Sequence, residues 1–169
     1  MRPSKVLIVM GSDSDFDAME PAWQVLDELG VGYEVRVASA HRTPDRAIEL
    51  ATQARDAGYG VIIAGAGGAA HLAGVLAAHT TLPVVATPVA VGTLGGVDAL
   101  LSAVQMPSGV PIASVGIGGA LNAGLFATAI LAASDETFAQ RLLEYRRARA
   151  EKVAAADERV RARLANRPK

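Results

Sequence analysis

His41 is the histidine of this chain best placed for proton transfer, because it stands directly beside a cation in the segment Ser39-Ala40-His41-Arg42. Histidine exchanges protons near neutral pH, so a single side chain can deliver a proton and later remove one. The planar guanidinium of Arg42 matches the oxygens of a phosphate or a carboxylate. These residues together predict acid–base chemistry on an anionic substrate.

A loop rich in hydroxyl and carboxylate groups follows the first apolar run. It has the sequence Gly11-Ser12-Asp13-Ser14-Asp15 and precedes a helical stretch. Glycine allows a sharp turn, and hydroxyls together with the amides at the start of a helix can hold a phosphate. The carboxylate of Asp15 could accept hydrogen bonds from ribose hydroxyls. Helix capping by Ser14 or Asp15 is the alternative interpretation.

A third segment of small residues, 65–71, has the sequence Gly-Ala-Gly-Gly-Ala-Ala-His. Its glycines permit close approach of the backbone to a planar ligand. The spacing matches neither a P-loop nor the dinucleotide-binding fingerprint. His71 is a candidate pocket residue, with capping or packing in a helix as the alternative. His79 and Asp98 are expected to be structural.

The elements that must position these loops alternate between strand and helix along the chain. Strands are predicted over residues 5–10, 33–38, 61–64, 83–87 and 112–116, and helices over 15–29, 43–58, 69–79, 96–105, 121–133 and 135–164. Successive βα units predict an α/β fold, a single flavodoxin-like three-layer domain with a five-stranded parallel sheet in the order 2-1-3-4-5. In that order, the loops after strands 1, 2 and 3 meet at the ligand crevice.

The charge distribution divides the chain into two parts. Residues 1–134 carry 6 basic and 11 acidic side chains, whereas residues 135–169 carry 10 basic and 6 acidic ones. We expect 1–134 to form the catalytic domain and 135–169 a helical extension packed on it or on a neighbouring subunit. Because acidic side chains interrupt the basic ones, a solvated helix is favoured over nucleic-acid binding.

Between residues 57 and 134 the only Asp, Glu, Lys or Arg is Asp98. A membrane segment would explain this composition, but Pro111 and several glycines break the apolar stretch into a strand-like and a helix-like part. Burial between the subunits of a homo-oligomer is the favoured explanation. The chain has no cysteine and no pair of histidines or carboxylates with metal-ligand spacing, so no metal site is expected. Met1 is followed by too short an apolar run for a signal peptide, and a cytoplasmic location is expected.

Four motifs in this order resemble the N5-carboxyaminoimidazole ribonucleotide mutase family of bacterial purine synthesis. They are Met10-Gly11-Ser12-Asp13-Ser14-Asp15, Ser39-Ala40-His41-Arg42-Thr43-Pro44, the run from Ile63 to Leu72, and Val104-Gln105-Met106-Pro107 followed by Gly109-Val110-Pro111. The similarity extends over residues 5–145. It implies a flavodoxin-like homo-octamer that acts on a small phosphoribosyl substrate without ATP, metal or organic cofactor.

The resemblance also implies roles for individual residues. His41 corresponds to the general acid/base, and substrate-binding positions are occupied by Ser12, Asp15, Arg42, Ser39, Ala40, Gly67 and His71. Arg42 and Ser12 are expected to bind the phosphate, and Asp15 the ribose. The chain departs from the family pattern at Ala73, where proline is usual, in the less polar loop 90–93, and in the shorter stretch 118–122.

The sequence leaves two alternatives to the mutase function open. The sister enzyme carboxylates aminoimidazole ribonucleotide directly with CO2 and needs the same Ser-Ala-His-Arg loop. The run from Gly65 to His71 is more similar to the mutase branch. A module that binds nucleotides without catalysis is the alternative from a different class, and it would not depend on the imidazole of His41.

Overall fold

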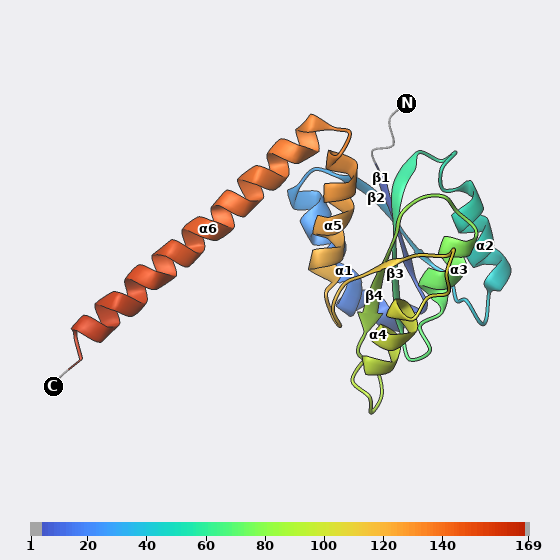
Figure 1. Ribbon diagram of the computed structural model, residues 1–169, viewed down its shortest axis with the longest axis horizontal. Helices are drawn as coiled ribbons and strands as arrows, with labels where there is room; N and C mark the ends of the chain where they lie inside the picture. Colours follow the sequence, from blue (N-terminus) through green and yellow to red (C-terminus); the bar gives the residue numbers. More distant parts are fainter. Residues whose placement is uncertain (1–4, 168–169) are drawn as a thin grey trace.

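A computed structural model describes residues 5–167 of the chain (Figure 1). Within this range five parallel strands form one sheet in the order β2-β1-β3-β4-β5, as predicted. The strands are β1 (Lys5–Met10), β2 (Gly32–Val37), β3 (Tyr59–Gly67), β4 (Val84–Val89) and β5 (Ala113–Ser114). Because the order reverses between β1 and β3, the crevice predicted for this topology lies at the carboxyl ends of these strands.

Each central strand sends alternate side chains into two separate cores. In β1, Val6 and Ile8 belong to one apolar cluster, whereas Leu7 and Val9 belong to the other. All four side chains are buried. This alternation follows from the two-residue period of a strand, and burial on both sides is typical of a parallel sheet covered by helices.

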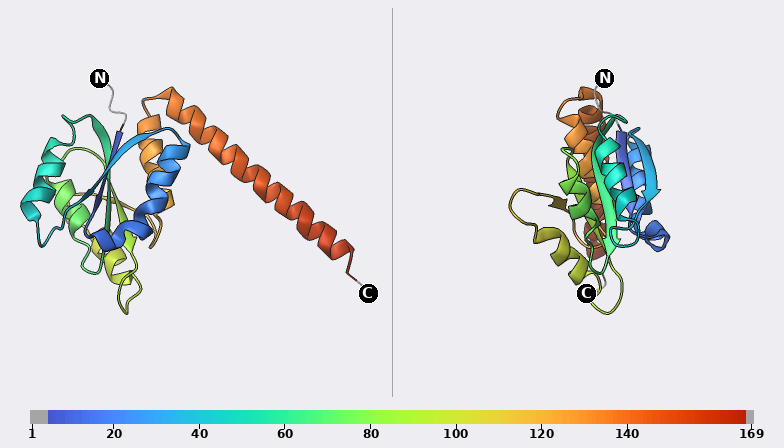
Figure 2. Two further views of the ribbon diagram at one scale, coloured as in Figure 1. Left: turned by 180° about the vertical axis from the view of Figure 1, so that it is seen from behind. Right: turned by 90° about the vertical axis from the view of Figure 1, so that its right-hand side faces the viewer.

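Helices cover both sides of the sheet (Figures 1 and 2). The helices α1 (Phe16–Glu28) and α5 (Ala120–Ala132) lie together on one side, and α2 (Pro44–Gln53) and α3 (Leu72–Ala78) lie on the other. A short 3-10 helix, η1 (Asp13–Asp15), precedes α1. The helix α4 (Val97–Val104) buries Ala103 in the core that contains α2 and α3. The described part of the chain therefore forms three layers.

The last helix, α6 (Glu136–Ala165), begins on the domain and then projects away from it (Figures 1 and 2). Asp135 caps its start by accepting a hydrogen bond from the Thr137 backbone amide at 2.9 Å. Phe138 and Leu142 are buried against the core beside α1 and α5. Beyond Tyr145, nearly all described residues of the helix are exposed. No described helix is both long and apolar enough to cross a membrane.

Several bounds differ from the sequence-based expectations. β3 is longer than the predicted 61–64, because its glycine and alanine residues continue the ladder, with Gly67 opposite Val89 of β4. β5 is shorter than 112–116, because only Ala113 and Ser114 pair with β4. The helix predicted over 69–79 is confined to Leu72–Ala78. Residues 1–4 of the expected catalytic domain and 168–169 of the expected extension lie outside the described residues.

A glycine in α5 allows this helix to lie close against α1. A methyl group added at Gly124 would lie 2.5 Å from Cγ1 of Val25 and 2.6 Å from the Ala22 carbonyl oxygen. We expect Gly124→Ala to lower the free energy of unfolding by about 1–3 kcal/mol, because the clash outweighs the gain in helix propensity. Chemical denaturation measures this change. The control is Gly74→Ala in α3, where the nearest atom is the flexible Met106 Cε at 3.2 Å and a smaller change is expected.

Candidate active site

The loops after β1, β2 and β3 enclose a pocket of about 420 Å³ at the carboxyl edge of the sheet. Every residue expected at the site from the sequence lines this pocket. These residues are Ser12, Asp15, Ser39, Ala40, His41, Arg42, Gly67 and His71. They come from three segments that are distant in sequence, so the parallel topology is what brings them together.

The loop after β1 is organised around Ser12 and Asp15. The Ser12 backbone amide donates to Oδ2 of Asp15 at 3.1 Å, and the Ser14 amide donates to Oγ of Ser12 at 3.3 Å. The Gly11 amide donates to the Gly65 carbonyl at 2.9 Å, which joins this loop to β3. Capping and ligand binding are therefore compatible: Asp15 holds the loop through one oxygen while its carboxylate borders the pocket.

Asp15 is a carboxyl group with only 5% of its surface exposed. Burial raises the pKa of the Asp15 carboxyl, and the charge of Asp13 raises it further. The hydrogen bond from the Ser12 backbone and the charge of Arg42 act in the opposite direction. The folded protein therefore binds the Asp15 proton more tightly than the unfolded chain does. Protonation of Asp15 thus stabilises the folded state at low pH, and this stabilisation is lost as pH rises through the raised pKa.

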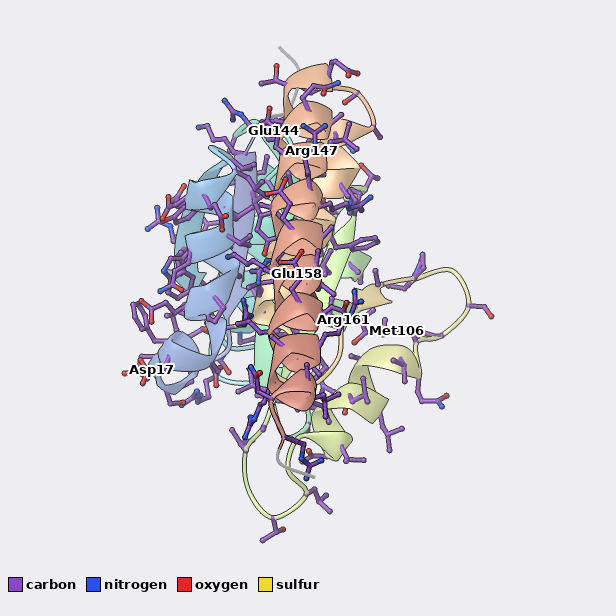
Figure 3. All side chains as sticks on the ribbon, turned by 90° about the vertical axis from the view of Figure 1, so that its left-hand side faces the viewer. Asp17, Met106, Glu144, Arg147, Glu158 and Arg161 are labelled. Carbon is purple, nitrogen blue, oxygen red and sulfur yellow. The ribbon has the colours of Figure 1, made fainter. Side chains whose placement is uncertain are left out.

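We expect Asp15→Asn to gain stability relative to the unmodified chain as pH rises, because asparagine has no buried charge to desolvate. The same variant should raise KM about tenfold if the carboxylate binds the substrate ribose. Denaturation between about pH 3 and 7 measures the first effect and steady-state kinetics the second. Asp17→Asn, at an exposed position of α1, is the control (Figure 3). A difference in unfolding free energy between Asp15→Asn and the unmodified chain that does not change with pH would contradict this account.

The loop after β2 is held by the hydroxyl of Ser39. Its Oγ accepts hydrogen bonds from the backbone amide of Arg42 at 3.2 Å and from Nε of Arg42 at 3.4 Å. Nη2 of Arg42 also donates to the carbonyl oxygen of Gly11 at 3.2 Å. Arg42 therefore lies between the loops after β1 and β2, with its guanidinium bordering the pocket.

His41 and His71 are hydrogen-bonded to each other. Nε2 of His41 lies 2.8 Å from Nδ1 of His71, and the rings meet edge to face with their centroids 4.9 Å apart. One imidazole must donate and the other accept, so the bond fixes the position of both rings. His71 lies directly before α3, and no described side-chain cap is formed there. Its pocket role is therefore better supported than a capping role.

The part of the pocket wall formed by the end of β3 and the segment after it consists of small residues. Ala66, Gly67 and Ala69 line this side of the pocket. Gly68 has φ 61°, a conformation that favours glycine. These residues have a methyl side chain or none, so the backbone of the segment lies close to the pocket; its close contact with a flat ligand stays a prediction.

The pocket also contains residues that the sequence-based assignment of site residues did not include. They are Gly11, Ser14, Ala66, Ala69, Leu72 and Val91. Most are neighbours of predicted residues and could have been included from the motifs. Val91 is different, because it comes from the segment after β4, and only its departure from the family pattern drew attention to that loop. Among the described residues no group of three or more His, Asp or Glu side chains is arranged so that it could hold a metal ion.

Comparison with known proteins shows the family of the chain. The family model described as AIR carboxylase matches residues 5–152. The chain belongs to the AIR carboxylase family. Among its relatives, a Bacillus subtilis protein named N5-carboxyaminoimidazole ribonucleotide mutase is 58% identical over 141 residues, which cover 82% of this chain and 87% of that one. A Mycobacterium leprae protein of the same name is 50% identical over 156 residues, or 92% and 91% of the two chains.

A solved structure has the same fold as this AIR carboxylase family member. Treponema denticola PurE superimposes with a TM-score of 0.84 at 28% sequence identity, covering 92% of this chain and 97% of that one. The matched region of the family includes all three pocket loops and the first half of α6. The predicted resemblance and the predicted flavodoxin-like fold are thus confirmed.

Proposed function

We propose that this protein converts N5-carboxyaminoimidazole ribonucleotide to 4-carboxyaminoimidazole ribonucleotide, without ATP, metal or organic cofactor. The observation that carries the proposal is one pocket that His41 and Arg42 line together with Ser12 and Asp15. Relatives that share 50–58% of its residues carry the name of this mutase. The pocket combines a proton-transfer group, groups that can bind a phosphoribosyl moiety, and a small-residue wall for a planar ring.

The chemistry requires two proton transfers and no net change in protonation. When the carbamate C–N bond breaks, its electrons stay on nitrogen, which takes a proton, and CO2 is released. The ring carbon of the aminoimidazole then attacks CO2 to form a C–C bond and afterwards loses its own proton. We propose that His41 delivers the first proton and removes the second, ending in its initial state.

The other pocket residues bind and orient the substrate in this proposal. Arg42 and Ser12 bind the phosphate, for which a guanidinium and a loop of hydroxyl and amide donors are suited. Asp15 accepts hydrogen bonds from the ribose hydroxyls. Ser39 and His71 hold Arg42 and His41 through the hydrogen bonds described above. Ala40 and Gly67 form pocket walls.

Two parallel ATP-free assays test the proposal. One contains N5-carboxyaminoimidazole ribonucleotide and the other contains aminoimidazole ribonucleotide with bicarbonate, and both are followed for the 4-carboxy product. We expect fast formation of product from the carbamate and little from the bicarbonate mixture. Fast product only from the second mixture would indicate the sister carboxylase. Binding with no conversion in either would indicate a module that does not catalyse.

We further propose that the protein is a cytoplasmic homo-octamer and that residues 135–169 form its assembly extension. Exposed apolar side chains continue along α6 beyond the domain, including Val153 and Val160. These two lie seven residues apart and therefore on nearly the same side of the helix. Side chains of both charges lie along the same helix, among them Glu158 and Arg161 (Figure 3). Such a helix suits packing on a second copy of this chain.

Light scattering of full-length variants tests the assembly. We expect Val153→Glu combined with Val160→Glu to lower the molecular mass of the particle, because two charges would enter an apolar contact. The matched control is Ala155→Glu with Ala162→Glu, which adds the same charge on the opposite side of the helix. An unchanged mass in the valine variant would overturn this role of α6.

A further inference from the structure

The segment between β4 and α4 contributes one residue, Val91, to the pocket. The other pocket residues in the described part of the chain belong to the segments at the ends of β1, β2 and β3. Val91 thus closes the pocket on the side toward β4. It is 41% exposed, so it packs against the pocket wall on one side and borders solvent on the other.

Val91 lies directly on the backbone of Gly67. A Cβ atom added to Gly67 would lie 2.5 Å from Cγ2 and 3.0 Å from Cγ1 of Val91. The carbonyl oxygen of Val89 would be the next nearest atom, at 3.1 Å. The isopropyl group therefore occupies the space that any side chain at position 67 would need. The contact joins the end of β3 to the segment just after its neighbour β4, since Gly67 pairs with Val89, the last residue of β4.

The chemical character of this contact matters for the proposed reaction. CO2 is small and uncharged, so charged side chains cannot retain it as they retain the phosphoribosyl group. Its escape must be prevented sterically, by walls that leave no gap beside the ring. At Gly67 the wall is bare backbone, and the γ carbons of Val91 are the atoms that cover it.

We propose that Val91 determines how well the pocket retains CO2 between its release from nitrogen and its capture by carbon. This inference rests on the proposed mutase function and assigns to Val91 a steric role only. The bonds that break and form are those given above, and Val91 exchanges no proton. Removal of its γ carbons should open a path past Gly67 and allow CO2 to exchange with solvent.

The exchange can be measured during turnover. Unlabelled N5-carboxyaminoimidazole ribonucleotide is converted in buffer containing carbon-13 bicarbonate, with carbonic anhydrase present to equilibrate CO2. The carbon-13 content of the product, corrected for an enzyme-free sample, gives the ratio of CO2 exchange to direct transfer. We expect Val91→Ala to raise this ratio about tenfold, the effect of removing small apolar groups from a pocket. Val97→Ala, an exposed valine of α4 that does not line the pocket, is the matched control.

A second variant tests the contact itself. Gly67→Ala should disturb the pocket because its new methyl group collides with Val91, and should lower kcat/KM. Combining it with Val91→Ala removes the collision with the γ carbons, leaves the 3.1 Å approach to the Val89 carbonyl oxygen, and places a methyl group where the γ carbons had been. We expect the double variant to recover activity and to retain CO2 better than Val91→Ala alone.

The outcomes separate the two proposals. Conversion by the unmodified chain, with equal labelling in Val91→Ala, would overturn the role of Val91 and leave the mutase function standing. A double variant less active than Gly67→Ala would also overturn it. No conversion by the unmodified chain would overturn the proposed function and this inference together.

Discussion

Replacement of His41 by Asn is expected to lower kcat about 10³-fold and to change KM by only a few-fold. Asparagine retains a polar group that can hydrogen-bond to His71, but it cannot exchange a proton. Both proton transfers of the proposed reaction would therefore be lost together. Steady-state kinetics with the carbamate substrate give the two constants, and the binding of the 4-carboxy product to the variant shows whether the pocket is intact.

The chain offers a matched control for this variant. His79 lies just after α3, where its Nδ1 is 2.8 Å from the Val75 carbonyl oxygen, and it does not line the pocket. His79→Asn should leave kcat unchanged. Turnover by His41→Asn within about tenfold of the unmodified rate would remove His41 from the mechanism.

Replacement of Arg42 by Ala is expected to raise KM about 100-fold, with a smaller effect on kcat. Charge-assisted hydrogen bonds contribute about 1.5–3 kcal/mol each, and the phosphate would lose its main cationic partner. The hydrogen bonds of Arg42 to Ser39 and to the Gly11 carbonyl would be lost too, so the loops after β1 and β2 would be less well ordered.

Arg42→Lys separates the loss of charge from the loss of geometry. Lysine keeps the positive charge but cannot reproduce the planar guanidinium contacts, so KM should lie between those of the unmodified chain and Arg42→Ala. If both variants lowered the unfolding free energy but left KM unchanged, Arg42 would be a structural link and not a phosphate ligand.

The α/β architecture could be predicted from the sequence because the alternation of strand-like and helix-like runs is compatible with few sheet topologies. The β-branched runs alternate with helical stretches, and few residues connect them. Short connections of this kind favour a parallel sheet with helices on both sides. The loops at the crevice then followed from the strand order. His41, Arg42 and Asp15 could be placed at one site for this reason, before any distance was known.

Contacts between loops could not be predicted in the same way. The hydrogen bond between His41 and His71 joins residues 30 positions apart and depends on the paths of two loops. Val91, in the segment after β4, contacts Gly67 at the end of β3, and no pattern in the sequence of its own loop indicates that contact. The predicted length of β5 was wrong for a related reason. Pairing at a sheet edge depends on the neighbouring strand more than on local propensity.

A crystal structure of His41→Asn with bound 4-carboxyaminoimidazole ribonucleotide would test the central claim most directly. The account predicts the phosphate against Arg42 and Ser12, the ribose hydroxyls at Asp15, and the imidazole ring against Gly67 with its carboxylate near position 41. A hollow of about 440 Å³ beside β5, α5 and α6, lined by residues such as Phe126 and Tyr145, is one alternative place for the ligand. Ligand found there, with the pocket between β1 and β3 unchanged, would contradict the account.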